Sequence, residues 1–325
     1  MGYFFLSLFC FVSLSSLVQS QLDYNFYKSS CPNLTRLVKG AVWAAVKNDS
    51  RMAASLLRLH FHDCFVNGCD ASLLLDDTAN FTSEKNAGPN RNSTRGFEVV
   101  DTIKASVEKE CPATVSCSDI LALAARDSVF LMGGPYWYVY LGRRDGKVGS
   151  ESAANSEIPG PSESLDKITD KFVAKGLNLK DVVVLSGGHT FGFAKCSTFS
   201  SRLFNHSGTG SPDPTLDSTL LEDLQSQCPN NASDTSTNLA PLDRVTTNYF
   251  DNVYYKNLIN NLGLLKSDQA LLTNNQTASM VANYSYNQYL FFKDFMVSMV
   301  KMANISVLTG QDGDIRKNCR FVNDA

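Results

Sequence analysis

The sequence has little excess charge of either sign: 29 lysines and arginines face 32 aspartates and glutamates, which gives a net charge of −3 over 325 residues. It therefore lacks the basic footprint of a nucleic-acid-binding protein, and it has no acidic tail. Beyond residue 20, no apolar run approaches the roughly 20 residues that a transmembrane helix needs. Internal repeats and long low-complexity linkers are also missing. These absences argue against a nucleic-acid-binding or membrane-spanning protein.

The hydrophobic content of 43% is enough for a substantial core, in one large domain or two lobes. Helical patterns dominate, and weak strand signals occur only near 137–141. Short helices joined by loops rich in proline, glycine and asparagine predict an all-α enzyme. Surface loops are expected at 207–214 and 230–238. The expected helices are 33–47, 51–63, 97–110, 117–132, 164–174, 179–185, 190–203, 248–260, 276–283 and 288–302.

The first twenty residues form a segment of their own. They hold no charged side chain, run apolar from Tyr3 to Val18, and end with small residues where a signal peptidase cleaves. This pattern predicts a secretory signal over residues 1–20 and a mature domain over 21–325. The mature chain would then start at Gln21 and have no membrane span.

Cysteine usage supports the same compartment. Eight cysteines remain after the signal, and an even count in a secreted chain implies four disulfides. Eight cysteines allow 105 pairings, of which only the short Cys64–Cys69 loop is decided by proximity. Nine Asn-x-Ser/Thr sequons fit a glycosylating pathway; they lie at Asn33, Asn48, Asn80, Asn92, Asn205, Asn231, Asn275, Asn283 and Asn304.

The most informative segment is 58–75, which reads RLHFHDCFVNGCDASLLL. Arg58 and His62 are four residues apart, so on a helix they share one face. Arg51 and Ser55 extend this face upstream, while apolar residues cover most of the remainder. A polar stripe is normally a solvated face, but here no other face could be buried alone. The stripe is therefore predicted to line an internal polar cavity that suits an anionic or proton-donating ligand.

His60 and His62 raise the alternative of a zinc site, because imidazole is the commonest metal ligand. Their spacing disfavours it, since residues i and i+2 point to different sides of a helix and zinc-binding pairs sit at i and i+4. His60 is instead predicted to be a structural histidine that bonds to the backbone or to a neighbouring helix.

A second motif, VVVLSGGHTFGFAKC over 182–196, is a buried apolar run that breaks at Gly187 and Gly188 and presents His189. A single histidine after a helix is usually structural. The two glycines favour another interpretation, because they would let a flat, bulky group approach the backbone. Together with Arg58 and His62, this motif suggests that one histidine ligates a haem iron while another works on the opposite side.

With these motifs in place, the chain resembles the secreted class III plant peroxidases over its whole mature length. Besides the two segments above, the resemblance rests on EKNAGPNRNSTRGF from Glu84, VSCSDILALAARD from Val115, LGRRDG from Leu141, and FDNVYYKNL and GLLKSDQALL near the end. It implies a mostly helical, two-lobed fold with minor β content and one haem b between the distal and proximal lobes. The disulfides it implies are Cys31–Cys111, Cys64–Cys69, Cys117–Cys319 and Cys196–Cys228.

The resemblance also implies roles for residues around the haem. His62 would be the distal acid and base, Arg58 its cationic partner, and His189 the iron ligand. Asn90, held by Glu84, would accept from Nδ1–H of His62, and Asp268 would do so for His189. Further residues implied are Phe61 above the haem, Pro159 at the exposed haem edge where donors bind, Arg51, Ser55 and Ser93 at a propionate, and Asp119 with Arg143 as a buried ion pair.

Two calcium ions are implied as well. Around the Cys64–Cys69 loop, side-chain and carbonyl oxygens form a hard set that suits calcium and not zinc. Without the family, acidic turn residues in a solvated loop would be the simpler interpretation. The distal set is Asp63, Val66, Gly68, Asp70 and Ser72, and the proximal set is Thr190, Asp243, Thr246, Tyr249 and Asp251. Thr247 stands where the family commonly has proline.

These implications predict an enzyme that reduces hydrogen peroxide and oxidises small phenolic donors in one-electron steps. Only Trp43 and Trp137 are present, and neither matches the haem-side tryptophans of the related intracellular peroxidases. We expect a monomer in the apoplast or cell wall, with roles in lignification or suberisation, peroxide removal, and stress or defence. The alternative is a wall glycoprotein that only binds polysaccharide or calcium, which would not need Arg58, His62, Asn90, His189 and Asp268 together.

Overall fold

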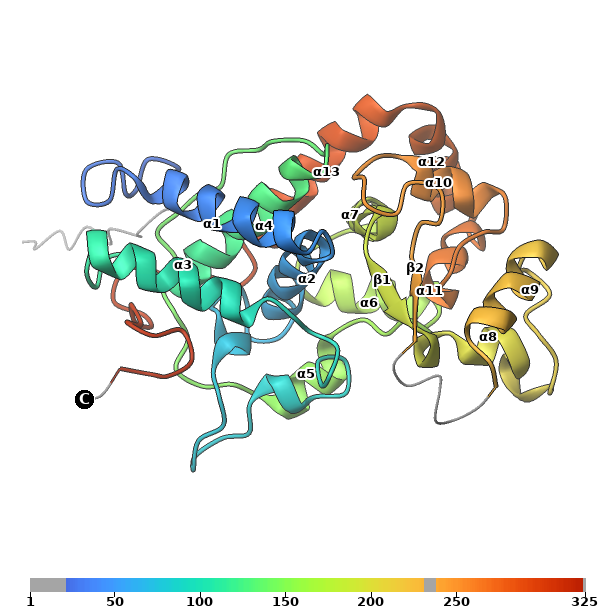
Figure 1. Cartoon of the computed structure of the whole chain (residues 1–325), viewed down its shortest axis with the longest axis horizontal. Coiled ribbons are helices and arrows are strands. Elements are labelled where there is room, and N and C mark those ends of the chain that lie inside the picture. The colour runs from blue at the N-terminus through green and yellow to red at the C-terminus, as the bar shows by residue number, and fades with distance from the viewer. Residues whose placement is uncertain (1–21, 231–237, 324–325) are drawn as a thin grey trace, which may run out of the picture.

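The computed structural model describes residues 22–230 and 238–323, and this part of the chain is mostly helical (Figure 1). Within these residues the single sheet has two short strands. The predicted all-α class with minor β content is therefore confirmed. The helices are α1 (Leu34–Asn48), α2 (Met52–Cys64), α3 (Phe97–Glu110), α4 (Cys117–Leu131), α5 (Glu151–Glu157), α6 (Leu165–Ala174), α7 (Leu179–Ser186), α8 (Ser200–Phe204), α9 (Ser218–Gln227), α10 (Val253–Ile259), α11 (Lys266–Gln269), α12 (Asn275–Tyr286) and α13 (Gln288–Met302); the strands are β1 (Phe193–Lys195) and β2 (Leu239–Pro241).

The helices gather in two groups, as Figure 1 shows. On one side α2 packs against α4, and α4 also packs against α1 and α3. On the other side α10, α12, α13 and α7 pack together, and 3₁₀ turns follow α7. The main core runs through both groups, while a smaller core lies around α8 and α9. The catalytic motifs predicted from the sequence lie on α2 and directly after α7, which face the middle of the molecule.

Local sequence signals set the ends of several helices. Helix α3 begins after Gly96, whose φ of +99° is a left-handed conformation that glycine adopts at little cost. Helix α4 is capped by the Ser116 hydroxyl, which accepts from the Asp119 amide. In α7 the Asn178 and Asp181 side chains form a reciprocal capping box. These three helices agree with the predicted ranges to within one residue.

The predicted helix over 190–203 is wrong. Phe191 is extended and Gly192 has φ +98°, so the chain leaves the helical conformation there. A Cβ on Gly192 would lie 2.8 Å from the Cβ of Ala54, so this turn approaches α2 closely. Residues 193–195 then form β1, which pairs antiparallel with β2 in the register Ala194 to Ala240. A 3₁₀ turn follows at Cys196–Thr198, and an α-helix forms again only in the short α8.

Other corrections concern weak signals. The strand expected near 137–141 is an irregular segment whose only ladder contact is a bridge between Leu141 and Asp23. Helices α5, α9 and α11 were not predicted, and the 3₁₀ turn at 206–208 overlaps the start of the expected 207–214 loop. The helix expected over 248–260 starts later, at Val253. Most of the 230–238 loop lies outside the described residues.

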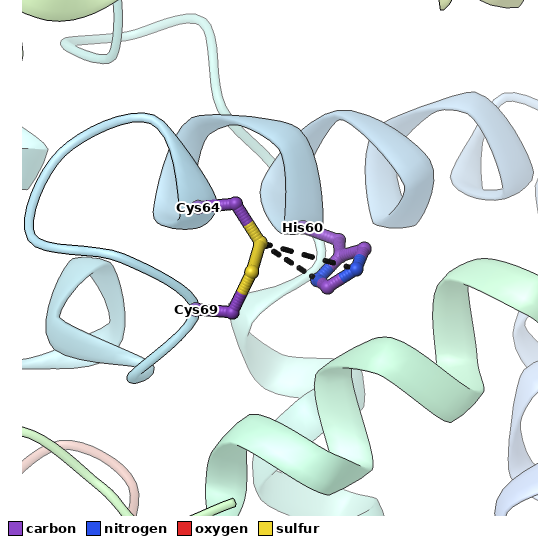
Figure 2. Close-up of side chains that lie close together, drawn as sticks. All are labelled: His60, Cys64 and Cys69. Carbon is purple, nitrogen blue, oxygen red and sulfur yellow. Dashed lines mark hydrogen bonds between the residues drawn. A yellow bond between two sulfur atoms is a disulfide. The ribbon is translucent and has the colours of Figure 1, made fainter. Parts of the chain in front are cut away.

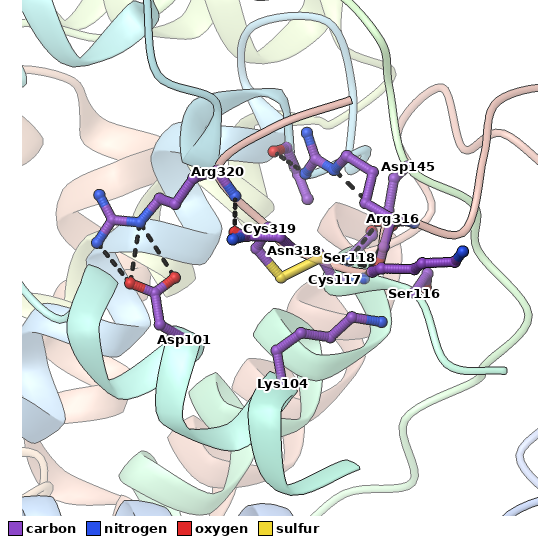
Figure 3. The surroundings of a disulfide bond; sticks show 12 residues. Asp101, Lys104, Ser116, Cys117, Ser118, Asp145, Arg316, Asn318, Cys319 and Arg320 are labelled. Atoms are coloured by element: carbon purple, nitrogen blue, oxygen red, sulfur yellow. Dashed lines mark hydrogen bonds and ion pairs between the residues drawn. A yellow bond between two sulfur atoms is a disulfide. The ribbon is translucent and has the colours of Figure 1, made fainter. Parts of the chain in front are cut away.

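Four disulfides close the fold in the pairs that the resemblance implies, Cys31–Cys111, Cys64–Cys69, Cys117–Cys319 and Cys196–Cys228. The third ties the C-terminal segment to the start of α4, 202 residues away in sequence (Figure 3). Beside it, Arg320 donates to both oxygens of Asp101 on α3. Arg316 is fully buried and donates to the Ala71 carbonyl at 2.6 Å. The end of the chain is therefore an integral part of the first helix group.

Among the described residues, no helix is both long enough and apolar enough to cross a membrane. Asp119 and Arg143 form a buried ion pair at 2.8 Å, as expected, and Asp119 also accepts from the Tyr27 hydroxyl.

Candidate active site

The polar stripe of α2 lies on the least buried side of the helix. Arg51, Ser55 and Arg58 are half-buried, whereas His62 at the inner end is buried. The Ser55 hydroxyl donates to the Arg51 carbonyl, and the Arg51 guanidinium lies 5.3 Å from the centre of the Phe193 ring on β1. The stripe thus runs from a partly open surface to a buried histidine.

His62 is held in one orientation by a chain of hydrogen bonds. Its Nδ1 lies 2.5 Å from Oδ1 of Asn90, whose amide nitrogen donates to the Glu84 main-chain carbonyl at 2.8 Å. Because an amide oxygen only accepts, Nδ1 must carry the proton and Nε2 is left as an acceptor. Glu84 therefore holds Asn90 through its backbone, and the type of side chain at Glu84 gave no hint of this.

Arg58 is the donor to that acceptor. Its Nε lies 3.1 Å from Nε2 of His62, while Nη1 donates to the Ser93 carbonyl and Nη2 to the Pro89 carbonyl. Burial lowers the pKa of Arg58 to about 10, so it stays cationic in neutral solution. The hydroxyl of Ser93, which is expected at a haem propionate, is directed to the carbonyls of Pro89 and Asn90 and accepts from Arg58.

The same surroundings keep His62 neutral. Burial lowers its pKa well below the ordinary value, and the positive charge of Arg58 lowers it further. The hydrogen bond to Asn90 acts in the opposite direction and does not outweigh them. A charge on His189 would also lower the pKa of His62, which means that the two imidazoles are within electrostatic reach.

His189 stands in the 3₁₀ turn after α7, and its Nδ1 lies 2.7 Å from Oδ1 of Asp268 on α11. Asp268 is also held by the Leu265 amide and by the Tyr254 hydroxyl, which donates to the same Oδ1 at 3.0 Å. Tyr254 was not foreseen, because nothing in the sequence connects it with Asp268. The His189 side chain is 40% exposed, and its Nε2 has no hydrogen bond within the described part of the chain.

The two glycines before His189 play different parts. A Cβ on Gly187 would lie 2.4 Å from the Tyr255 hydroxyl and 2.6 Å from the Phe291 ring, so Gly187 permits close packing within the second helix group. A Cβ on Gly188 would be 3.6 Å from Leu57 of α2, so only Gly188 is on the side facing α2. The expectation that both glycines admit a flat group therefore does not apply to Gly187. Gly188 is the one that could serve this purpose.

An imidazole with Nδ1 bonded to a carboxylate and Nε2 free is the donor that a haem iron takes from a protein. The residues present thus fit haem. Phe61, expected above the haem, is half-buried with its ring 5.4 Å from the His62 ring, and Pro159 is half-buried in the link between α5 and α6.

His60 does not belong to a metal site. It lies beside Cys64 and Cys69, as Figure 2 shows, with Nδ1 3.7 Å from the Cys64 sulfur. Both sulfurs are bonded to each other and so offer no thiolate to zinc. Burial and the charge of Arg143 lower the pKa of His60 to about 3, so it is a neutral structural histidine.

The expected distal calcium residues lie together after α2. Both oxygens of Asp63 accept backbone amides, from Ala71 and Leu73, and Oδ1 of Asp70 accepts the Ser72 amide. Burial raises the pKa of Asp63, and the nearby charge of Asp70 raises it further.

Two polar atoms of this loop have no partner in the described structure. The Ser72 hydroxyl and Oε2 of Glu84 are both buried without a hydrogen bond. Burial raises the pKa of Glu84 to about 8. Buried carboxylates and an unpaired hydroxyl form a hard-oxygen set that fits a calcium ion.

One contact in this loop was not foreseen. Lys175 after α6 donates to the Val66 carbonyl at 2.7 Å and pairs with Glu157. A carbonyl oxygen has two lone pairs, so Val66 retains one for a cation. Gly146 packs against Asp70, because a Cβ there would lie 2.1 Å from Oδ2.

The expected proximal calcium residues also lie together. Thr190 and Thr246 both donate to Oδ1 of Asp251, at 3.2 and 3.3 Å, and Thr246 also reaches Asp243. Burial raises the pKa of Asp243, with a further rise from the charge of Asp251. Thr247 donates to the Asp243 carbonyl at 2.8 Å, a bond that proline could not make.

Comparison with known proteins agrees with this geometry. A family model described as Peroxidase matches residues 38–287. Peroxidase 10 of Arabidopsis thaliana is 60% identical over 304 residues, which cover 93% of this chain and 87% of that protein. Peroxidase N of Armoracia rusticana is 56% identical over 326 residues, covering 99% of this chain and 97% of that protein. The chain therefore belongs to the class III plant peroxidases, a family of haem enzymes that reduce hydrogen peroxide.

Proposed function

We propose that this chain is a secreted peroxidase whose site consists of Arg58 and His62 on the distal side, and of His189 and Asp268 on the proximal side. The observation that carries the proposal is the bond between Nδ1 of His62 and Asn90, which fixes a neutral histidine with Nε2 available as a base. A merely structural histidine would not need Arg58 beside that nitrogen.

His189 would ligate iron through Nε2, with Phe61 over the haem face and Arg51, Ser55 and Ser93 at a propionate. When bound, haem b supplies an iron centre that exchanges single electrons with donors. Asp268 would draw on the Nδ1 proton of His189 and make this ligand more electron-rich.

His62 and Arg58 divide the work on hydrogen peroxide. Nε2 of His62 would take a proton from one peroxide oxygen and return it to the departing oxygen, acting first as base and then as acid. Arg58 would stabilise the charge that develops on the departing oxygen, a contribution of roughly 3–4 kcal/mol at comparable sites. The carbonyls of Ser93 and Pro89 hold the guanidinium in place for this task.

Two calcium ions would complete the enzyme. The distal ion would use Asp63, Asp70 and Ser72 with the carbonyls of Val66 and Gly68, and the proximal ion would use the set listed above around Asp251. Support comes from the buried carboxylates and from the unpaired Ser72 hydroxyl.

Small phenolic donors would bind near Pro159, and the protein would act as a monomer in the apoplast or cell wall. Its roles there would be lignification or suberisation, peroxide removal, and stress or defence responses. The proposed signal 1–20 lies outside the described residues. Support for export comes from the four disulfides and from the sequons, since seven of the eight described sequon asparagines are exposed and Asn33 is partly buried.

The absorption spectrum of the purified protein tests the function. We expect a ferric Soret band and rapid turnover of guaiacol with hydrogen peroxide. A Soret band without turnover would favour the alternative of a wall glycoprotein that only binds polysaccharide or calcium. The absence of a Soret band would contradict the proposed roles of His189 and of the distal residues alike.

Tyr254 offers a test of the proximal side. In Tyr254→Phe, Asp268 loses a hydrogen-bond donor and becomes a stronger acceptor for the Nδ1 proton of His189. A more electron-rich ligand stabilises ferric iron, so the reduction potential should fall by about 20–60 mV, where 59 mV is a tenfold change for one electron. A spectroelectrochemical titration measures this shift.

The matched control is Tyr255→Phe, because Tyr255 is equally buried but donates to the Val183 carbonyl and not to Asp268. Its potential should stay at that of the parent. If Tyr254→Phe and Tyr255→Phe shift the potential equally, or if Tyr254→Phe raises it, the proposed influence of Tyr254 on His189 is refuted.

A further inference from the structure

A pocket lies away from the residues assigned to haem, peroxide and calcium. It is formed by the N-terminal segment 24–35, by α4 and by the segment 136–141, and its volume is about 230 Å³. None of the residues that line it has a part in the proposed reaction. The segment 136–141 includes residues 137–141, for which the sequence weakly predicted a strand.

Tyrosine rings form the mouth of this pocket. The rings of Tyr24 and Tyr138 are 5.0 Å apart, and those of Tyr136 and Tyr138 are 6.4 Å apart. These side chains are 51%, 65% and 43% exposed for Tyr24, Tyr138 and Tyr136. Clustered aromatic rings that face water around a hollow are typical of a binding site and not of a random surface.

A cation with an unused donor lies at the base of the pocket. Arg126 on α4 is only 2% exposed; its Nε donates to Asp127 at 2.7 Å and Nη1 to the Trp137 carbonyl at 3.2 Å. Its guanidinium stacks 4.3 Å from the centre of the Tyr136 ring. Nη2 is buried without a hydrogen bond in the described structure, and an unpaired buried donor of a charged group costs free energy.

Size and chemistry together define the ligand. A cavity of about 150 Å³ accommodates benzene, so this pocket has room for one aromatic ring with a short substituent. Ring faces and aliphatic side chains suit an aromatic ring, and the Tyr27 hydroxyl is already committed to Asp119. Arg126, with the exposed Lys28 at the same pocket, favours a carboxylate on the substituent.

We propose that this pocket binds a single-ring aromatic carboxylate against the Tyr24 and Tyr138 pair, with the carboxylate directed to Arg126 and Lys28. An acidic sugar would be a different ligand: its several hydroxyls would each need a hydrogen-bond partner, whereas the tyrosine rings offer flat apolar faces that suit an aromatic ring. Binding at this place would not require the haem or peroxide.

The experiment is a ¹⁹F NMR titration of the resting holoenzyme with 4-fluorobenzoate, which has no phenol to oxidise. Replacing Arg126 could unfold the protein because it is buried, so the variant is Tyr138→Ala, at a position that is largely exposed. Its control is Tyr289→Ala, which removes another largely exposed tyrosine, in the first turn of α13.

We expect saturable binding that Tyr138→Ala weakens about three- to tenfold, as the loss of one aromatic contact predicts, and that Tyr289→Ala leaves unchanged. Lys28→Gln should weaken 4-fluorobenzoate but not the neutral 4-fluorobenzyl alcohol. Guaiacol turnover should be the same in all three variants.

Three outcomes would overturn the proposal. One is equal binding by the parent and Tyr138→Ala. Another is a Soret shift that follows the NMR titration with the same midpoint, which would place the ligand at the haem. The third is binding of galacturonate in place of 4-fluorobenzoate, which would make the site one for acidic sugars.

Discussion

Replacing His62 by alanine should slow the reaction with hydrogen peroxide by at least the roughly 10²–10⁴-fold that a positioned acid and base contributes. The reason is geometric, since Nε2 of His62 is the only basic atom that the structure places against Arg58. Stopped-flow measurement of the first spectral change after mixing with peroxide gives the rate. The resting Soret band should persist, because His189 is untouched.

Arg58→Leu is the companion variant. It should slow the same step less than His62→Ala does, because it removes charge stabilisation and leaves the base in place. Since burial and Arg58 lower the pKa of His62, the parent should keep its base neutral, and its rate unchanged, in mildly acidic solution. A His62→Ala protein that reacts at the parent rate would show that another group moves the proton.

Asp70→Asn should remove the distal calcium ion and lower the rate of reaction with peroxide by up to about 10²-fold. Few residues separate the calcium site from the base. Asp63 directly follows His62 in α2, and it lies close enough to Asp70 to feel its charge. A shift of Asp63 therefore moves the end of the helix that carries the base, and a displacement near 1 Å can have this cost. Elemental analysis should find one calcium ion, against the two that we propose for the parent.

Prolonged chelation of the parent should have the same effect, with haem still bound at first and activity partly restored by added calcium. The control is Asp312→Asn, which removes a charge from an exposed loop outside both calcium sets. An Asp70→Asn protein that keeps both ions and the parent rate would disprove the coupling. Loss of the ion with an unchanged rate would disprove only the connection to His62.

The parts of this fold that could be predicted from the sequence are those whose decisive contacts are local. Helices α3 and α7 begin directly after Gly96 and Asn178 for reasons that lie within a few residues, and both were predicted closely. The segment 190–203 was wrongly predicted as one helix. Its apolar pattern fits a helix, but residues 193–195 instead pair with β2, which lies more than forty residues later in the sequence. Gly192 was the one local signal that could have revealed the break.

The same distinction applies to the candidate site. Arg58 and His62 could be placed together from their spacing alone, because one helix carries both. The contact of Lys175 with Val66 and that of Tyr254 with Asp268 join different elements, and no periodicity encodes them. The roles of Asn90 and Asp268 came from resemblance to a family, and their positions in space needed the fold.

The anchored C-terminal segment has a consequence for biosynthesis. Asp145 accepts the amides of Cys117 and of Arg316, so a single carboxylate joins the start of α4 to a residue 199 positions later in the sequence. While the chain is being translated, α1 to α4 can form and collapse, but this carboxylate and Cys117 must wait for their final partners. The first helix group is thus completed only once this distant segment has been made, and Cys117 cannot form its native disulfide before then.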